Sequence, residues 1–502
     1  KQALASEGSS AEASPDYAAR PVPLKSMSCT RTAYTRFVIT SSITASQTET
    51  RFAVKVAEDF SPTPVAVEAS DDLSFSSPLI VRLRGIWAQT PVETKDAINV
   101  VWDAWPSPGP GAASVAKTLQ EALQLSEIIV DDEHHWIIVC PDILISPSIV
   151  GSASKCLRQA ILTSNVRDSA SSKACTMGNL KHDLFEYAMV HEDFSVDGLR
   201  KAAKRIMSSR SEECCASNVT DAEASRSLYS FLPKIVKWAG VHMTSVARGK
   251  PQVQMDPATP PIDRVLTSEE DIVSPMWGLR ARPDVSVAVS CTGPANSHST
   301  MLPGGVLPLE LKTGMPYQAH EAQAVLYGVA FADRYGDPNQ YAGPPPMSAQ
   351  SVPAASQSFE AALLVYLGLK DGHAEKEKTR AIHHKRLELQ ALLDLRNRVA
   401  RASSSQKHEM VTTSMNGGAV DTLIPAGRLL PTVIERVNTC GSCYVRDACA
   451  LYHKAWEETG AEGTIKSTKI RELFEESVGH LNEKEIKYFQ KFSRLLDLEA
   501  ST

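Results

Sequence analysis

The stretch LPLELKTG, residues 307–314, places two charged side chains in an otherwise apolar run. Side chains two positions apart on a β-strand point to the same face. Glu310 and Lys312 would therefore emerge together from a strand that otherwise favours burial. A salt bridge on an edge strand is the ordinary explanation for an isolated pair of this kind.

A second carboxylate favours a catalytic explanation. Asp284 lies within another apolar, strand-like run, RARPDVSVAV, residues 280–289. Two carboxylates and a lysine on adjacent strands can hold Mg²⁺, which prefers carboxylate, water and phosphate oxygens. Bound Mg²⁺ lowers the pKa of a water and neutralises charge building on phosphorus, while Lys312 orients the water or stabilises the developing charge. The pattern therefore predicts phosphodiester hydrolysis, with Asp284 and Glu310 as metal ligands.

The composition is that of a globular protein. The 502 residues are 43% hydrophobic and 22% charged, enough for about two to four domains. No apolar run approaches the roughly 20 residues that span a bilayer, and no secretory signal is recognisable, so we expect no membrane association. The net charge of −6 does not favour a nucleic-acid partner, although an acidic protein can carry a locally basic channel. Without a secretory signal, clustered cysteines favour metal or iron–sulfur ligation over disulfides.

Composition and periodicity divide the chain into four regions. Residues 1–34 are small, polar and aperiodic, which predicts disorder. Residues 35–147 carry short β-branched and aromatic runs between turns, which is typical of a small barrel or sandwich. Residues 148–455 mix helical and strand patterns, and residues 456–502 are helical. Three polar, aperiodic insertions are also expected to be disordered: residues 290–305, 336–358 and 402–420.

Two helical stretches add further candidates. GNLKHDLFEYAM contains His182, and HEAQAVLYGVAFADRY contains Gln323 and Tyr327, which share a helix face at i, i+4. Taken singly, each has an ordinary explanation: a partly exposed helix histidine, a solvated glutamine and a core-facing tyrosine. Three other acidic residues near these candidates are interpreted as a turn residue, Asp142, and as solvated helix charges, Glu186 and Glu321.

The order of the candidates carries more information than any one of them. In chain order they are His182, Asp284, Glu310, Lys312, Gln323 and Tyr327. This order resembles the RecB-like branch of the PD-(D/E)xK nucleases, which have an α/β fold. The resemblance implies metal-dependent DNA cleavage, with His182 as a further metal ligand. It also implies that Gln323 and Tyr327 arrange the lysine and the DNA.

A cysteine cluster indicates a second metal centre. CGSCYVRDAC supplies Cys440, Cys443 and Cys449, and a fourth ligand must come from elsewhere. His453 would complete a local zinc site with finger-like spacing. Cys156, far upstream, would complete an all-sulfur set, which suits an iron–sulfur centre. The resemblance to RecB-like nucleases with a 4Fe–4S cluster favours Cys156 and implies that the cluster clasps the two ends of the nuclease fold.

The resemblance extends beyond these motifs. CPDILISPSIVGSASKCLRQAIL, SPMWGLRARPDVSV and CGSCYVRDACALYHKA are similar to segments of the eukaryotic DNA replication ATP-dependent helicase/nucleases. The similarity covers roughly residues 35–500, in which 35–147 would form an OB-like β-barrel and 148–455 the nuclease domain. Residues 456–502 resemble the helical segment that leads towards the family's helicase region. The chain contains no phosphate-cradling G-x-x-x-x-G-K-[ST] loop, so we expect no ATPase site in it. One departure is Pro283, which takes the place of a more usual aliphatic residue and is tolerable on an edge strand or at a bulge.

The resemblance also implies a biological setting. It implies a nuclear single-strand endonuclease, with a mitochondrial pool also open, that trims flapped DNA during Okazaki-fragment maturation and resects DNA ends. Replication protein A would be a partner, the cofactors would be Mg²⁺ (with Mn²⁺ able to replace it) and the 4Fe–4S cluster, and we expect a monomer.

Two alternatives remain open. A nuclease fold without activity could serve as a single-strand-binding module, since OB-like barrels bind single strands by aromatic stacking and a basic groove. The intact Asp284, Glu310 and Lys312 argue against this reading. A stand-alone RecB-like nuclease is the other alternative, and the N-terminal 145 residues count against it because such proteins are much shorter.

Overall fold

The computed structural model defines the fold for most of the chain. It describes residues 34–57, 79–101, 127–165, 172–247, 259–289, 305–335, 361–367, 378–383, 385–404, 408–415, 418–425, 430–457 and 465–500. The expected disorder in 1–34, 290–305 and 336–358 lies outside these ranges, apart from the last residue of each of the first two stretches. No helix among the described residues is long and apolar enough to cross a membrane.

The N-terminal region forms one six-stranded sheet in the order β5-β3-β2-β1-β4-β6. Its strands are β1 (Tyr34–Ala45), β2 (Glu49–Val56), β3 (Leu79–Arg84), β4 (Ala97–Val101), β5 (Glu127–Val130) and β6 (Trp136–Val139), with a 3-10 turn, η1 (Gly85–Gln89), after β3. All pairs are antiparallel except β3 with β5. Alternate residues of β3 are buried, and β1 is interrupted by two register shifts, which bend a strand. The expected β-rich region is confirmed, and the sheet remains unclosed between β5 and β6 among the described residues. Whether it is an OB-like barrel stays a prediction.

The second sheet has five strands in the order β13-β12-β11-β10-β7. They are β7 (Ile262–Ser268), β10 (Val285–Val289), β11 (Gly305–Lys312), β12 (Ala361–Tyr366) and β13 (Lys378–His383). Only β11 and β12 are parallel, so the chain must cross over between them. Helix α9 (Gln318–Tyr335) makes this crossover, at the position expected from the sequence. The α/β class is thereby confirmed.

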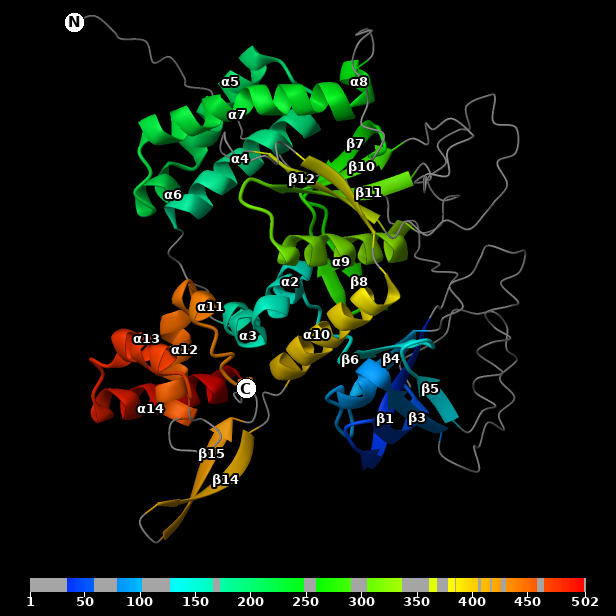
Figure 1. Cartoon of the computed structure of the whole chain (residues 1–502), viewed down its shortest axis with the longest axis vertical. Coiled ribbons are helices and arrows are strands. Elements are labelled where there is room, and N and C mark those ends of the chain that lie inside the picture. Colours follow the sequence, from blue (N-terminus) through cyan, green and yellow to red (C-terminus); the bar gives the residue numbers. More distant parts are fainter. Residues whose placement is uncertain are drawn as a thin grey trace, which may run out of the picture.

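Helices cover both faces of the second sheet (Figure 1). On one side lie α4 (Lys173–Val190), α5 (Val196–Ser209), α6 (Ser211–Ala216), α7 (Asp221–His242) and α8 (Thr244–Ala247). Leu307, Leu309 and Leu311 of β11 share a buried cluster with this layer. Glu310 faces the other way, where it contacts a side chain of α9. The prediction that Glu310 and Lys312 leave the strand on one face is confirmed by their mutual ion pair.

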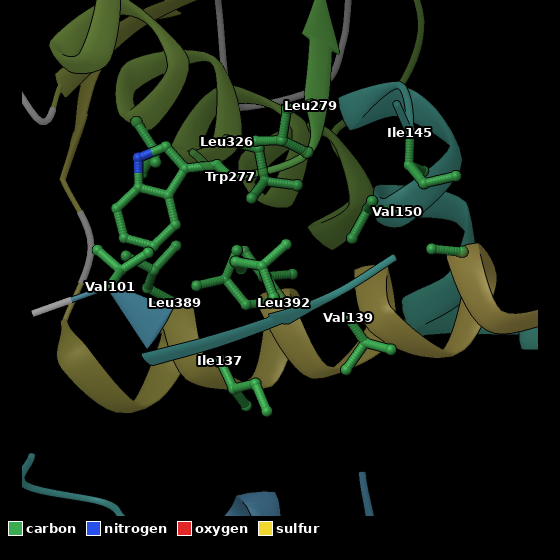
Figure 2. Packing of buried hydrophobic residues seen from close by; sticks show 14 of the residues in the cluster. Val101, Ile137, Val139, Ile145, Val150, Trp277, Leu279, Leu326, Leu389 and Leu392 are labelled. Atoms are coloured by element: carbon green, nitrogen blue, oxygen red, sulfur yellow. The ribbon is translucent and has the colours of Figure 1, made fainter. Parts of the chain in front are cut away.

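A single buried core joins the two sheets. It includes side chains of α2 (Pro147–Lys155), α9 and α10 (Arg386–Ser404) together with β6. Figure 2 shows Ile137 and Val139 of β6 beside Leu389 and Leu392 of α10, with Trp277 nearby. The N-terminal sheet therefore packs on the layers of the second sheet through a continuous apolar contact.

The strand-like run expected at residues 280–289 is broken in two. Strands β8 (Ile272–Ser274) and β9 (Leu279–Ala281) form a separate two-stranded ladder, and β10 begins at Val285. Pro283 lies in the break, so its missing backbone donor costs no ladder hydrogen bond. Asp284 is thus placed directly before β10 rather than inside it.

The C-terminal region is helical, as expected, with one exception. It contains α11 (Val437–Gly441), α12 (Arg446–Tyr452), the π-helical turn η3 (His453–Glu457), α13 (Thr468–Val478) and α14 (Glu483–Ala500) (Figure 1). Helix α3 (Leu157–Asn165), from far upstream, contacts α12. The expectation of disorder across 402–420 is wrong: α10 runs to Ser404, and β14 (His408–Met415) pairs with β15 (Gly418–Pro425) as a hairpin. The two strands pair through their backbone groups. Their β-branched residues favour strands, but the segment is polar and aperiodic, so its sequence pattern did not predict the hairpin.

Candidate active site

Asp284 occupies the junction between the sheet and helix α4. Its Oδ2 accepts a hydrogen bond of 2.6 Å from the backbone N–H of Leu311, on the neighbouring strand. Its Oδ1 lies 3.3 Å from His182 Nδ1. The structure therefore brings together a helix histidine and a strand-end aspartate that are separated by about a hundred residues of sequence.

Glu310 is the most deeply buried carboxylate of the site. Its side chain is only 6% exposed, and its Oε1 accepts hydrogen bonds from Lys312 Nζ at 2.6 Å and Gln323 Nε2 at 2.8 Å. Its Oε2 is buried and has no hydrogen-bond partner among the described residues. Burial, followed by the negative charge of Asp284, raises the pKa of Glu310 to about 7, although the Lys312 ammonium opposes the rise. A buried acceptor without a partner is costly unless another group binds it.

Gln323 and Tyr327 form a buried chain of hydrogen bonds behind Glu310. Gln323 Nε2 also donates to Tyr327 Oη at 2.9 Å, and Tyr327 Oη donates to the carbonyl oxygen of Arg282 at 3.0 Å. Both side chains come from one face of α9, as the i, i+4 spacing predicts. Their contacts position Glu310, and through it Lys312.

His182 is held next to carboxylates that favour its charged form. Burial alone would lower the pKa of the imidazole, but the hydrogen bond and the charge of Asp284, with the charge of Glu310, raise it above its ordinary value. Lys312 pairs with Glu310, and His182 lies against Asp284, so each carboxylate of the site has a basic side chain beside it.

Two further carboxylates approach Asp284, and the sequence interpretation missed them. Glu186 lies one turn after His182 on α4, and burial followed by the charges of Asp183 and Asp284 raises its pKa. The expectation that Glu186 is a solvated helix charge is wrong, and its i+4 spacing from His182 was the available signal. Glu269 donates its backbone N–H to the Asp284 carbonyl at 3.1 Å and pairs with Arg282. Nothing in the local sequence marks Glu269, because its place depends on the turn after β7.

His320 and Tyr366 flank Lys312. Tyr366 is the register partner of Lys312 across the parallel β11–β12 pair, and His320 Nδ1 lies 3.2 Å from Tyr366 Oη. Burial, together with the charge of Lys312, lowers the pKa of His320 to about 4, so this imidazole is neutral.

The interpretations of two other acidic residues are confirmed. Asp142 lies in a turn and Glu321 is an exposed charge on α9, and each forms an ion pair with an arginine.

The four candidate cysteines line one cavity between α3 and α12. Its lining includes Cys156, Cys440, Cys443 and Cys449 with apolar side chains such as Leu162, Val433 and Phe474. All four are free thiols. Burial first, and then the neighbouring charge of Cys156, raises the pKa of Cys440. Hence Cys156 lies close to cysteines almost three hundred positions downstream.

The alternative fourth ligand, His453, has a different position. It is not among the residues lining this cavity in the described part of the chain. Its Nδ1 lies 2.9 Å from Glu457 Oε2, and its ring packs edge-on against Phe474. The geometry therefore groups Cys156, rather than His453, with the three downstream cysteines.

Neither candidate centre is a preformed metal cage. Among the described residues, no three His, Cys, Asp or Glu side chains already stand in a ligating arrangement. At the carboxylate site, His182 and Lys312 already pair with Asp284 and Glu310, the two carboxylates that would bind a cation. Binding a cation there would require these cationic side chains to give way, and Glu310 Oε2 is the free acceptor that would receive it.

The chain is similar in sequence to known replication proteins. The family model described as DNA replication factor Dna2 matches residues 76–289, which include Cys156, His182 and Asp284. The chain is 27% identical to the mouse DNA replication ATP-dependent helicase/nuclease DNA2 over 444 residues, 84% of this chain and 35% of the relative. It is 26% identical to the human protein of the same name over 446 residues, with the same two shares, and 24% identical to the fission yeast one over 421 residues.

The chain spans about a third of the length of the mouse and human relatives it matches. These two alignments cover 84% of the chain. The resemblance expected from the sequence is confirmed, and the chain is a homologue of the nuclease portion of the DNA replication ATP-dependent helicase/nucleases.

Proposed function

We propose that the chain hydrolyses phosphodiester bonds in single-stranded, flapped DNA during replication and end resection. The carrying observation is Glu310, a buried carboxylate with one free oxygen beside Asp284, His182 and Lys312. The printed names of the relatives supply the setting, since they describe replication proteins with nuclease and helicase activity. Homology supports an enzyme that acts on DNA in replication, and the helicase would lie in a part of the protein outside this chain.

The carboxylate site suits Mg²⁺, with Mn²⁺ as a substitute. Asp284 Oδ1 and Glu310 Oε2 are the oxygens that would hold the ion, with His182 as the third ligand; oxygen-rich donors are what Mg²⁺ prefers. When bound, the ion would lower the pKa of a water and screen the phosphate charge.

The protein's own groups supply the rest of the chemistry. Gln323 fixes Glu310, so that one carboxylate oxygen faces Lys312 and the other remains free. The Lys312 ammonium, once released from Glu310, can donate to the attacking water or to a phosphate oxygen as charge develops there. The backbone N–H of Leu311 holds Asp284 in place at 2.6 Å. The arrangement restrains each of the reacting groups before the substrate arrives.

The cavity lined by the four cysteines would hold the 4Fe–4S cluster. Four free thiols in an apolar pocket match the all-sulfur donor set that such clusters require. The cluster would join α3 to α12 and so connect the start of the nuclease domain to its end. Nuclear residence, a partnership with replication protein A and a monomeric state accompany this proposal as expectations from the family.

The test is Mg²⁺-dependent cleavage of an end-labelled flap substrate by anaerobically purified protein. Wild type is compared with Glu310→Gln, which keeps the side-chain volume but removes the anionic ligand. Glu321→Gln serves as the matched control, because Glu321 lies in the first turn of α9 and pairs with Arg380 at the surface. We expect cleavage by wild type and the control, none by Glu310→Gln, and equal single-strand binding by all three. Binding without cleavage by wild type under both Mg²⁺ and Mn²⁺ would instead establish the binding module.

A further inference from the structure

Arg158 is a buried cation in the wall of the cysteine cavity. It stands two residues after Cys156 on α3, and its side chain is 1% exposed. Burying a guanidinium is expensive unless its donors and charge are matched. The arginine must therefore contribute something that an apolar residue of similar size would not.

All three nitrogens of the Arg158 guanidinium have hydrogen-bond partners. Nε donates to Cys449 Sγ at 3.0 Å, and Nη2 lies 3.4 Å from the Cys449 carbonyl oxygen. Nη1 donates to the Pro431 carbonyl at 3.0 Å and to Glu457 Oε1 at 2.6 Å. One planar group thus ties α3 to the segment before α11, to α12 and to the π-helical turn after it. Only the fork geometry of arginine can serve these partners together.

The bond to sulfur is the chemically specific contact. A charged N–H donor at a cysteine sulfur stabilises the thiolate, which is the form that binds metal. Glu457 neutralises the same guanidinium from the other side, so the charge can remain buried. Arg446 provides a comparison within the cavity wall, because it is also an arginine but its Nε donates to Ser477 Oγ at 3.1 Å.

We propose that Arg158 is a positioning residue for the cluster: its N–H bond holds the Cys449 sulfur toward the cavity and tunes the cluster's reduction potential. This inference rests on the cluster assignment made with the proposed function. Hydrogen bonds to ligating sulfurs set the potentials of iron–sulfur centres, because they stabilise the more negative reduced form. Removing the bond should therefore lower the potential and loosen Cys449.

The experiment compares Arg158→Lys with Arg446→Lys in the whole chain, purified without oxygen. Both changes keep a positive charge in the cavity wall, but only the first removes the planar donor at Cys449. Iron and sulfide per chain, the rate of iron loss to a chelator, and the midpoint potential in a dithionite titration are measured. We expect Arg158→Lys to have a more negative potential and to lose iron several-fold faster, and Arg446→Lys to match wild type.

A second measurement covers the case in which Arg158→Lys does not fold. The Arg446→Lys variant is used because it leaves Arg158 as the arginine in the described lining of the cavity. It is prepared with arginine labelled with ¹⁵N in the guanidino group, and the reduced cluster is examined by pulsed electron paramagnetic resonance. A ¹⁵N coupling is expected from Arg158, and its absence would refute the bond to sulfur.

The outcomes separate this inference from the nuclease proposal. Wild-type potential and iron retention in Arg158→Lys would overturn the role of Arg158 and leave the cluster and the nuclease standing. A wild-type protein that binds zinc and no iron would overturn the cluster and this inference together. The flap-cleavage result with Glu310→Gln is independent of both.

Discussion

At the scale of single residues, the candidate chemistry depends on how Glu310 is held. One of its oxygens is bound by Lys312 and Gln323, and the other has no partner among the described residues. Without these bonds, the flexible glutamate side chain would adopt several rotamers. Gln323 removes that freedom, and Tyr327 in turn fixes Gln323. The site is thus organised by groups that never need to touch the substrate.

Gln323→Leu should weaken Mg²⁺ binding while leaving the ligands in place. Leucine fills similar space but removes the 2.8 Å bond to Glu310, and losing a partner of a metal ligand typically costs about 10–100-fold in metal affinity or activity. We expect the Mg²⁺ concentration for half-maximal cleavage to rise by about that factor, measured by metal titration of flap cleavage. Glu321→Gln on the same helix should titrate as wild type does. An unchanged titration for Gln323→Leu would mean that Glu310 is fixed by packing alone.

Metal affinity should also rise with pH. Burial and the charge of Asp284 raise the pKa of Glu310 to about 7, and the pKa of His182 is raised as well. Both groups bind protons more tightly than usual, and a cation must displace those protons, so acid opposes binding. We expect Mg²⁺ affinity, measured by calorimetry, to increase between about pH 6 and pH 8. In Glu310→Gln the remaining dependence should be shallower, and an equally steep curve in that variant would contradict the assignment.

At the scale of elements, the two sheets depend on α10 for their connection. Arg396 is fully buried on α10, and its guanidinium donates to the carbonyls of Gly278, Cys140 and Ile143 at 3.1, 2.9 and 2.7 Å. The neighbouring Asn397 caps the edge strand β6 by bonding both Val139 N and the Ile137 carbonyl. These contacts satisfy loop backbone groups that would otherwise be buried without partners.

Gly278→Ala should disrupt this connection. Gly278 has a φ of +59°, and an added Cβ would lie 2.1 Å from Arg396 Nη2. The backbone conformation alone costs an L-residue about 1–3 kcal/mol, and the buried Arg396 would have to give up hydrogen bonds to move aside. We expect a clearly lower melting temperature by circular dichroism. Gly240→Ala is the control, because nothing lies within 4 Å of its added Cβ and alanine is the better helix former by about 0.5–1 kcal/mol. Equal melting temperatures for the two variants would contradict the role given to Gly278.

At the scale of the whole molecule, local patterns predicted more than distant contacts. The face shared by Glu310 and Lys312 and the extent of α9 follow from periods of two and 3.6 residues, and the structure has both. The break at Pro283, the β14–β15 hairpin and the approach of Glu269 to Asp284 do not follow, because each depends on turns or long-range packing. Arg396 and Arg158 were invisible for the same reason. Their partners lie more than a hundred residues away, so no local pattern marks a cation that will be buried.

The last prediction concerns the link between two segments that are far apart in the sequence and carry the four cysteines of the cavity. Cys156→Ser should abolish the 4Fe–4S cluster, because the sulfur of Cys156 lines the same cavity as the three downstream cysteines. His453→Ala should leave metal content unchanged, because His453 pairs with Glu457 instead. Iron and zinc are measured by elemental analysis, and amide hydrogen exchange follows α11 to α13. Loss of the cluster should speed exchange in those helices and leave β11 protected, since the second sheet has its own buried core. Cys215→Ser, at an exposed thiol, is the control. If Cys156→Ser retained zinc and His453→Ala lost it, the centre would be the local zinc site. The metal would then not link Cys156 to the downstream cysteines.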